Sequence, residues 1–366
     1  METLQCSMKL SLKNSLVPEI SYTRYYGNLH NMQLPDTMRA MVLEKAGLPL
    51  VLKELPIPTI QQDEVLVKVI ACGVCRTDLH IADGELEHPK LPLILGHEIV
   101  GTVVKAGAAV QELKKGDVVG IPWVAYTCGE CKYCKRGQEN LCDNALFTGY
   151  TIDGGYAQYT AANMHFCFQL PSGYAQPSTA PLLCAGLIGF RSYNMIDVLA
   201  QKIGIYGFGG AAHILVQIAV QQQKKIYAFT SNGDVQAQRL ALDLGAVWAG
   251  DSTQTPPVAL DAAIIFAPVG SLVPKALQDS DKGAAIICGG IHMSDIPSFP
   301  YSILWGERMV RSVANLTRKD GLDFFETLQK APVKTTTQLF QLNEANEALN
   351  KLRSGAIHGA AVLVMK

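Results

Sequence analysis

Short apolar runs, each bounded by glycine, proline or aspartate, fill the chain from Met38 to about Pro171. Runs of this kind are typical of β-strands that are separated by turns. The pattern predicts strands at residues 64–70, 99–104 and 116–120. Because many short strands follow one another, we expect a mainly β, barrel-like first domain.

The pattern changes after Pro171, where apolar runs alternate with stretches that are apolar at helical spacing. It predicts strands at 202–206, 226–229, 262–266 and 284–288, and helices at 211–222 and 235–244, the second ended by Gly245. Alternating strands and helices favour a parallel, doubly wound sheet. A helix near 343–352 and a strand at 360–364 follow, and we expect that strand to return to the first domain.

Residues 1–37 fit neither pattern. They lack the continuous apolar stretch and the small-residue cleavage site of a secretory signal. They are also too irregular to predict a strand or a helix. We therefore expect a weakly ordered extension, or residues that precede the true start of the protein.

Composition narrows the function classes. The chain has 366 residues, 48% hydrophobic and 17% charged, which is enough for two folded domains. A formal net charge of −1 gives no electrostatic footprint for nucleic acid or an anionic membrane. No apolar run approaches the roughly 18 residues that span a bilayer. We expect neither kind of partner.

Ten cysteines could form disulfides in a secreted protein. With no signal peptide and with metal-like spacings, reduced thiolate ligands in the cytoplasm are favoured instead. Four of the cysteines lie outside both constellations described below, and we interpret them as buried or incidental thiols: Cys6, Cys72, Cys167 and Cys288.

The first constellation is a local cluster with the spacing C-x2-C-x2-C-x7-C, formed by Cys128, Cys131, Cys134 and Cys142. Four thiolates leave no position for water, as a closed, structural zinc site requires. The surrounding loop has turn residues and almost no core-forming alternation, so a metal would supply its missing folding energy. The alternative is four unrelated thiols.

The second constellation is dispersed and consists of Cys75, His97 with Glu98, and Cys184. Two thiolates and one imidazole would leave a fourth zinc position open for water or substrate. Taken singly, His97 and Cys184 resemble ordinary core residues. Glu98 favours the functional interpretation, because a second buried polar group without a partner is costly.

Cys75 opens a hexapeptide, Cys75 to His80, in which each polar residue has a possible task. Thr77 can exchange a proton with a substrate oxygen, and His80 can relay that proton to solvent. Arg76 can bind a pyrophosphate, and Asp78 can orient a ligating imidazole. A solvated surface turn is the alternative.

A glycine-rich turn, G-x-G-x-x-A, follows the predicted strand at 202–206 and opens the next helix. Backbone N–H groups at a helix N-terminus can face a pyrophosphate, so the turn predicts a dinucleotide site. Its residues are Gly207, Gly209, Gly210, Ala211 and Ala212.

Together these residues resemble the zinc-dependent medium-chain alcohol dehydrogenases, from about Met38 to the C-terminus. The shared motifs are CGVCRTDLH, LPLILGHE, CGECKYC with Cys142, DGGYAQY, PLLCAG and GFGGAA. The resemblance implies an α/β protein with a GroES-like β-barrel catalytic domain (38–184 and 318–366) and a doubly wound, parallel-sheet Rossmann domain (185–317). It also implies two zinc ions per chain, with Cys75, His97 and Cys184 holding the catalytic one and Glu98 beside it.

The resemblance further implies a proton relay through Thr77 and His80, with Asp78 behind the ligating histidine. Trp123 matches a position that lines the substrate pocket. Leu86 stands where some members carry a bulky aromatic residue, so we expect a pocket that admits more than ethanol. The implied reaction is reversible hydride transfer between an alcohol and an aldehyde or ketone, with NAD(P) as coenzyme, in a homo-oligomer (dimer or tetramer).

Coenzyme choice departs from the NAD-preferring pattern. Members that prefer NAD carry an acid at the end of the second Rossmann strand, where this chain has Thr230, followed by Ser231 and Asn232. No Lys or Arg lies immediately beside them. We therefore expect NADP(H) to be accepted, with a slight preference for it. Gly359-Ala360 replaces a Gly-Arg pair that many members use as a phosphate partner.

Two rival functions are disfavoured by the sequence. A zinc-free reductase of the same superfamily, acting on quinones or enones, should lack the set Cys75, His97 and Cys184, which this chain carries. A non-enzymatic zinc module that binds nucleic acid would need a more basic chain and no dinucleotide turn.

Overall fold

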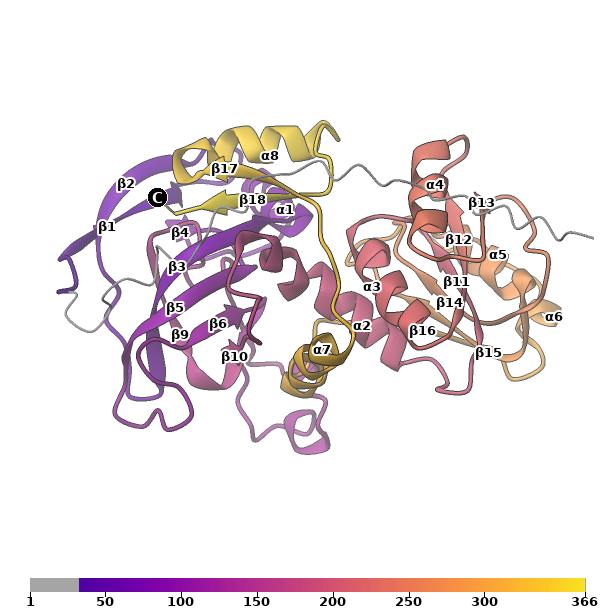
Figure 1. Ribbon diagram of the computed structural model, residues 1–366, viewed down its shortest axis with the longest axis horizontal. Helices are drawn as coiled ribbons and strands as arrows, with labels where there is room; N and C mark the ends of the chain where they lie inside the picture. Colours follow the sequence, from indigo (N-terminus) through magenta and orange to yellow (C-terminus); the bar gives the residue numbers. More distant parts are fainter. Residues whose placement is uncertain (1–32, 366) are drawn as a thin grey trace, which may run out of the picture. The chain divides into compact units, whose positions relative to one another are not determined.

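The computed structural model describes residues 33–365 (Figure 1). We expect residues 1–37 to form a weakly ordered extension. Residues 1–32, with Cys6 among them, lie outside the described part of the chain. The fold begins with β1 at Thr37. The predicted fold class is confirmed, because a β-rich part and a parallel α/β part follow one another along the chain.

The β-rich part contains three sheets. The main sheet has the order β10-β6-β5-β3-β18-β17, and β9 also pairs with β3. Its strands are β3 (Glu64–Val74), β5 (Ile99–Ala106), β6 (Val118–Ile121), β9 (Tyr159–Asn163), β10 (Phe168–Gln169), β17 (Thr337–Gln341) and β18 (Ala360–Val364). The smaller sheets comprise β1 (Thr37–Leu43), β2 (Val51–Pro56) and β4 (Leu93–Ile94), and β7 (Val124–Tyr126) with β8 (Leu146–Phe147).

The C-terminal strand returns to this part, as predicted. β18 runs antiparallel to β3, with Val362 opposite Gly73 and Val364 opposite Ala71. The helix expected near 343–352 is a 3-10 turn (Leu342–Glu344) followed by α8 (Ala345–Arg353). Before it comes α7 (Arg318–Lys330), which the sequence analysis did not predict.

The α/β part is a six-stranded parallel sheet with the order β13-β12-β11-β14-β15-β16. Its strands are β11 (Lys202–Tyr206), β12 (Lys225–Thr230), β13 (Trp248–Asp251), β14 (Leu260–Ile265), β15 (Ser280–Cys288) and β16 (Met309–Ser312). The connecting helices are α3 (Gly210–Gln221), α4 (Val235–Asp243), α5 (Leu272–Asp279) and α6 (Tyr301–Leu304). Strand order reverses between β11 and β14, and in such sheets ligands bind outside the carboxyl ends of the strands at that point.

The side chains of β11 are buried on both faces of this sheet. Ile203 and Ile205 belong to a core cluster with α3, whereas Tyr206 belongs to the opposite cluster with α5. A third cluster joins the β-rich part to α2 (Ala185–Asn194), α3 and α7. Within it, Phe190 of α2 and Phe324 of α7 pack at 5.3 Å between ring centroids. This packing brings the start of α2, which carries Cys184, against the barrel.

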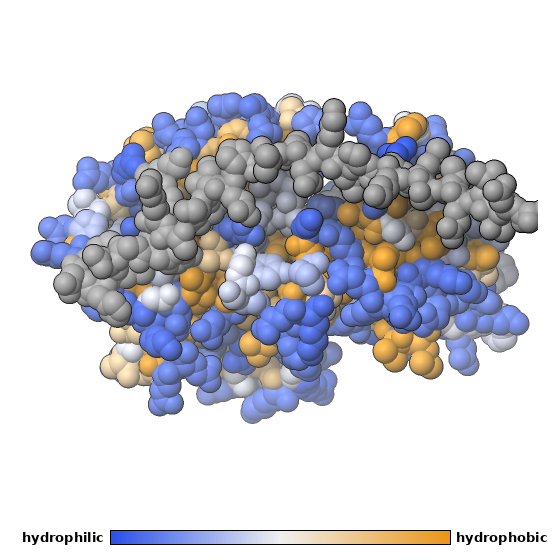
Figure 2. Space-filling model, in the orientation of Figure 1, coloured by the Kyte–Doolittle hydropathy of each residue, from blue (hydrophilic) through white to orange (hydrophobic). Residues whose placement is uncertain are grey.

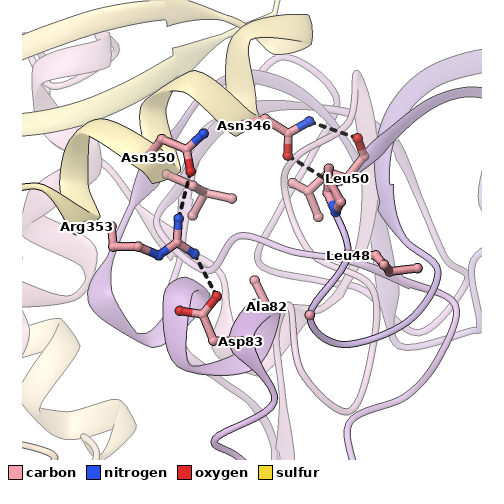
Figure 3. Close-up of a pocket in the computed structure, with 10 residues that line it drawn as sticks. Leu48, Leu50, Ala82, Asp83, Asn346, Asn350 and Arg353 are labelled. Atoms are coloured by element: carbon pink, nitrogen blue, oxygen red, sulfur yellow. Dashed lines mark hydrogen bonds and ion pairs between the residues drawn. The ribbon is translucent and has the colours of Figure 1, made fainter.

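One helix of the β-rich part, α1 (Arg76–Asp83), is held at its end by the C-terminal region. Asp83 forms an ion pair with Arg353 of α8 at 2.6 Å, and Asn346 exchanges two 2.9 Å hydrogen bonds with the backbone of Leu50 (Figure 3). These groups line a cavity of about 260 Å³. Because α1 also carries Thr77, the contacts fix a helix that contributes to the site described next.

Among the described residues, none of the helices combines the length and apolar character that a membrane crossing demands. The face drawn in Figure 2 is mainly hydrophilic, with apolar patches between the polar residues.

Candidate active site and metal centres

The dispersed set converges in space. The ligand atoms of Cys75, His97, Glu98 and Cys184 all lie within 4.8 Å of one another. Cys75 precedes α1, His97 and Glu98 precede β5, and Cys184 precedes α2. Each residue therefore stands at the start of an element, and the packing of these elements, rather than any local spacing, forms the cluster.

Asp78 fixes the first of these residues. Cys75 is the N-cap of α1, and its backbone N–H donates to Asp78 Oδ2 at 2.8 Å, as in a capping box. The helix ends at Gly84, whose φ of 81° lies in the left-handed region that favours glycine. Local sequence thus determines where the thiol of Cys75 lies.

His97 is fully buried and faces Asp78, with 3.3 Å between its Nδ1 and Asp78 Oδ1. Neither ring nitrogen has a well-formed hydrogen bond to another residue. Buried polar atoms are nearly always satisfied, so an imidazole with an unsatisfied nitrogen beside two thiols fits a metal ligand. Burial disfavours the imidazolium, but Asp78 and Cys75 together outweigh burial and raise the pKa of His97.

The two thiols of the cluster lie within hydrogen-bonding reach of each other. Their sulfur atoms lie 3.8 Å apart. The Cys184 thiol, through a hydrogen bond, lowers the pKa of Cys75 well below its usual range, against the opposing effect of burial. The same contact, together with burial, raises the pKa of Cys184. A site with one thiolate already favoured is chemically suited to a soft or borderline cation.

Glu98 is 5% exposed, and burial and then the charge of Cys75 raise its pKa. It lies against β3: a Cβ added to Gly73 would meet Glu98 Oε2 at 1.8 Å. The glycine therefore provides the space that the carboxyl group occupies. Gly73 was not singled out in the sequence analysis.

The predicted relay residues lie on α1 but do not touch each other. Thr77 is buried, and its hydroxyl lies 3.8 Å from the sulfur of Cys75. His80 is half-buried and pairs through Nδ1 with Glu85 instead. Arg76 is exposed at the first position of the helix. Within the described residues, no hydrogen bond joins Thr77 to His80.

Aromatic rings line one side of the cluster. Trp123 meets the ring of His97 edge-on at 5.0 Å and stacks on Phe147 at 5.2 Å and on Tyr150 at 5.6 Å. The Tyr150 hydroxyl donates to the backbone carbonyl of Glu87. This bond ties the loop that carries the half-buried Leu86 to the aromatic wall. The sequence analysis missed Phe147 and Tyr150, because nothing in their spacing from Trp123 indicated that the three rings would meet.

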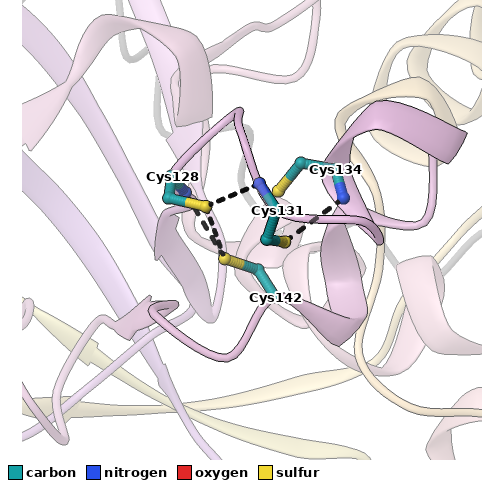
Figure 4. Close-up of side chains that lie close together, drawn as sticks. All are labelled: Cys128, Cys131, Cys134 and Cys142. Carbon is teal, nitrogen blue, oxygen red and sulfur yellow. Dashed lines mark hydrogen bonds between the residues drawn. The ribbon is translucent and has the colours of Figure 1, made fainter.

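The local cluster also assembles. The sulfur atoms of Cys128, Cys131, Cys134 and Cys142 lie within 4.8 Å of one another (Figure 4). Backbone N–H groups donate to these sulfurs, from Cys131 to Cys128 at 3.4 Å and from Cys134 to Cys131 at 3.5 Å. Hydrogen bonds from backbone N–H groups, above all that of Glu130, lower the pKa of Cys128 to about 6. Burial raises the pKa of Cys134 to about 12.

This cysteine lobe is attached to α7. Glu139 of the lobe forms an ion pair with Arg318 at 2.6 Å and also accepts from the Arg318 backbone N–H at 2.7 Å. Asn140 donates to the carbonyl of Ala314 at 2.7 Å. The lobe thus contacts the segment through which the chain leaves the parallel sheet.

The glycine-rich turn has the geometry that was expected. Gly207 has a φ of 92°, and a Cβ on it would lie 2.6 Å from the backbone nitrogen of Ala267. Gly209 is the N-cap of α3, and a Cβ on it would meet open space. Gly210 and Ala211 begin the helix, and Ala212 is fully buried against the sheet. Open N–H groups at this helix start fit a dinucleotide phosphate.

The end of β12 differs from the simple expectation. Thr230 is only 2% exposed, and its hydroxyl bonds to the carbonyls of Ser231 and Gly250 at 3.2 and 3.4 Å. Ser231 is exposed. Across the sheet from Thr230 stands Asp251, which accepts from the Gly233 N–H at 3.0 Å. The sequence analysis did not consider this acid, because it is 21 residues from Thr230 and reaches the strand end only through β13.

Comparisons with known proteins agree with this architecture. Residues 61–172 match the family model "Alcohol dehydrogenase GroES-like domain". A protein from Mycobacterium tuberculosis named "Probable alcohol dehydrogenase AdhA" is 46% identical over 316 residues, which cover 84% of this chain and 91% of that protein. The chain belongs to the alcohol dehydrogenase family.

Two further relatives of this family are similar over nearly the whole length. An alcohol dehydrogenase from Geobacillus stearothermophilus is 35% identical, covering 90% of this chain and 99% of that protein. The solved structure of acetophenone reductase from Geotrichum candidum, in complex with NAD, is 28% identical with a TM-score of 0.79, covering 91% of this chain and 98% of that one. Like other members of the alcohol dehydrogenase family, the chain is an oxidoreductase.

Proposed function

We propose that the chain catalyses reversible hydride transfer between an alcohol and an aldehyde or ketone, with NAD(P) as coenzyme. The observation that carries the proposal is the convergence of Cys75, His97, Glu98 and Cys184 within 4.8 Å, beside the Thr77 hydroxyl and the Trp123 ring. Cys75, His97 and Cys184 would hold a zinc ion, with Glu98 beside it. When bound, zinc supplies a Lewis acid for the substrate oxygen, and NAD(P) exchanges the hydride.

The chain's own side chains then bind the substrate and move its proton. Trp123, Phe147 and Tyr150 form an apolar wall that holds the carbon skeleton and excludes water from one side. The Thr77 hydroxyl would accept the proton of the substrate hydroxyl and pass its own proton to a bridging hydroxyl group, of water or of the coenzyme, which would carry it to His80. His80, which is half-buried, exchanges that proton with solvent. Asp78 keeps the imidazole of His97 in the orientation that ligation requires.

Initial-rate kinetics with a panel of aldehydes, using NADH and then NADPH, test this function. We expect turnover that needs bound zinc and prefers aldehydes large enough to contact the aromatic wall. Turnover that persists after zinc has been removed from both sites would contradict the proposal.

The cysteine lobe would hold a second zinc ion with a structural role. Four sulfur atoms lie close together there, and backbone N–H groups already donate to three of them. Sulfur ligands with such donors around them are typical of closed zinc sites. The two sites together give the proposed content of two zinc ions per chain.

For the coenzyme, we propose that NADP(H) is accepted with a slight preference. The neutral Thr230 and the exposed Ser231 support acceptance, and the dinucleotide phosphates would contact Arg76 and the turn from Gly207 to Ala212. The carboxylate of Asp251 would repel a 2′-phosphate, which keeps the preference for NADP(H) small.

Substitutions at this strand end test the coenzyme proposal. Thr230→Asp should shift kcat/KM toward NAD(H) by on the order of 1–3 kcal/mol. Asp251→Asn should shift kcat/KM the opposite way. Strict NAD(H) use by the wild type would show that a residue other than Thr230 or Ser231 selects the coenzyme.

We also propose a cytoplasmic homo-oligomer, dimer or tetramer, whose domains span 38–184 with 318–366, and 185–317. Cysteines at the described positions are free thiols, which supports a reducing compartment.

The proposed oligomer has a candidate contact surface at β16. This strand is the last of its sheet, its four residues are exposed, and nearby Tyr301 and Trp305 are 66% and 67% exposed. An unpaired strand edge with apolar neighbours suits a second copy of the chain. Sedimentation should show no monomer at micromolar concentration, and a monomer would contradict this proposal.

A further inference from the structure

A buried tyrosine that the mechanism above does not use lies beside the active-site cluster. Tyr156, from the motif DGGYAQY, is 0% exposed, and its hydroxyl donates to Asp78 Oδ2 at 3.2 Å. Burial, and then the charge of Asp78, raise the pKa of Tyr156. The hydroxyl therefore remains a donor under ordinary conditions.

The two oxygens of Asp78 have separate partners. Oδ2 accepts from the Cys75 backbone N–H at 2.8 Å and from Tyr156. Oδ1 faces Nδ1 of His97 at 3.3 Å. Two donors on one oxygen fix the rotation of the carboxylate about its Cβ–Cγ bond, so the other oxygen is directed at the imidazole. Without the hydroxyl, a single backbone donor would hold that rotation.

Tyr156 also contacts the segment that carries His97. Its backbone N–H donates to the carbonyl of Leu95 at 2.9 Å. Its ring lies directly against Gly96, where an added Cβ would be 2.4 Å from Tyr156 Cδ1. Gly96 has a φ of 99°, in the left-handed region that suits glycine. Ring and hydroxyl thus act on the same histidine from two sides, through packing and through Asp78.

We infer that Tyr156 is a positioning residue for the active-site metal, acting through Asp78 on the ligand His97. This inference rests on the metal ligation proposed above. It separates two contributions of one side chain: the ring supports the backbone at Gly96, and the hydroxyl orients the carboxylate. Tyr156→Phe keeps the first and removes the second.

Metal release tests the inference directly. The zinc-loaded chain is mixed with a chromogenic chelator, and the release phase that is missing from Cys75→Ser is assigned to the active site. Partners of metal-bound histidines usually contribute 10–100-fold to affinity. Because Tyr156 acts one hydrogen bond further away, we expect Tyr156→Phe to release this metal about 3–10-fold faster.

A double-mutant cycle shows whether the effect passes through Asp78. If it does, adding Tyr156→Phe to Asp78→Asn should accelerate release little beyond Asp78→Asn alone. Tyr206→Phe is the matched control, because Tyr206 is also fully buried and donates to a carboxylate, Asp279, at 2.6 Å in the parallel sheet. That variant should lose similar stability and leave the active-site release phase unchanged.

Each result bears on the inference. Unchanged release in Tyr156→Phe, full additivity with Asp78→Asn, or equal acceleration by Tyr206→Phe would overturn it while leaving the metal site intact. A wild-type chain without any phase that depends on Cys75 would instead contradict the proposed function, and this inference with it. Cobalt substitution gives a second readout: the visible absorption bands assigned to the active site should shift in Tyr156→Phe and not in Tyr206→Phe.

Discussion

The two cysteine clusters of this chain are built in opposite ways. In the lobe, four sulfur ligands lie within one short segment, Cys128 to Cys142, and backbone N–H groups of the same segment donate to them. In the active-site cluster, the ligands come from three separate segments, and Asp78 and Tyr156 contact the segments that carry Cys75 and His97. If the lobe holds the zinc ion proposed above, we expect it to need that metal to keep its shape, whereas the surrounding fold should shape the active-site cluster.

This difference predicts that losing a ligand has different consequences at the two sites. In the lobe, the free energy of the proposed metal binding would also be folding free energy. At the active site, buried apolar side chains pack α2 against the β-rich part, so loss of the proposed metal should remove chemistry and leave the fold in place.

The largest effect is expected from Cys131→Ser. Structural zinc contributes on the order of 10 kcal/mol to small zinc domains, and we expect the lobe to depend on its proposed zinc in the same way. We expect loss of soluble protein or a strongly lowered Tm, measured by thermal unfolding with and without added zinc. A normal Tm in Cys131→Ser would show that the lobe folds independently of a metal.

Cys75→Ser should have the converse phenotype. We expect turnover to fall at least about 10⁴-fold, since one thiolate ligand and the charge it contributes are lost. Circular dichroism and Tm should remain close to those of the wild type. If the variant unfolded as readily as Cys131→Ser, the contrast between the clusters would be wrong.

Thr77→Ala should cost about 10²–10⁴-fold in kcat, the usual range for a positioned proton-transfer group. His80→Ala should cost less, because water can reach its half-exposed position and replace the imidazole. The pair is measured by kcat with one alcohol at saturating coenzyme. A larger loss for His80→Ala than for Thr77→Ala would reverse the proposed order of the relay.

The smallest effect concerns how the lobe is attached to the rest of the molecule. Glu139 is 7% exposed, accepts hydrogen bonds from the backbone N–H and the Nε–H of Arg318, and forms an ion pair with its Nη2. Glu139→Gln should therefore lower the free energy of unfolding by about 1–3 kcal/mol. The control is Asp323→Asn, which breaks an exposed i,i+4 pair with Lys319 on the same helix. That change should cost under about 0.5 kcal/mol. Equal costs would mean that the lobe contact contributes no more than a surface pair.

The same contrast explains what the sequence could predict. The lobe could be identified from spacing alone, because its ligands are neighbours in the chain. The strands at 202–206 and 360–364 have the predicted bounds, since both are short apolar runs with clear ends. The active-site set needed family motifs, because no spacing rule links Cys75 to Cys184.

What the sequence could not reveal depends on tertiary packing. α7 carries Gly321 in its first turns, which weakens a helix prediction, yet the glycine is needed where Phe168 packs: a Cβ there would lie 2.2 Å from the ring. Asp251 reaches Thr230 only across paired strands. Tyr156 reaches Asp78 over 78 residues. Each of these contacts is made by elements whose relative positions no local pattern encodes.

Zinc content, measured by elemental analysis, separates the two clusters. After exhaustive dialysis of the zinc-loaded protein, we expect two zinc ions per chain for the wild type and one for folded Cys75→Ser. A single zinc ion per wild-type chain, or two in Cys75→Ser, would contradict the division into a structural lobe and a separate active-site cluster.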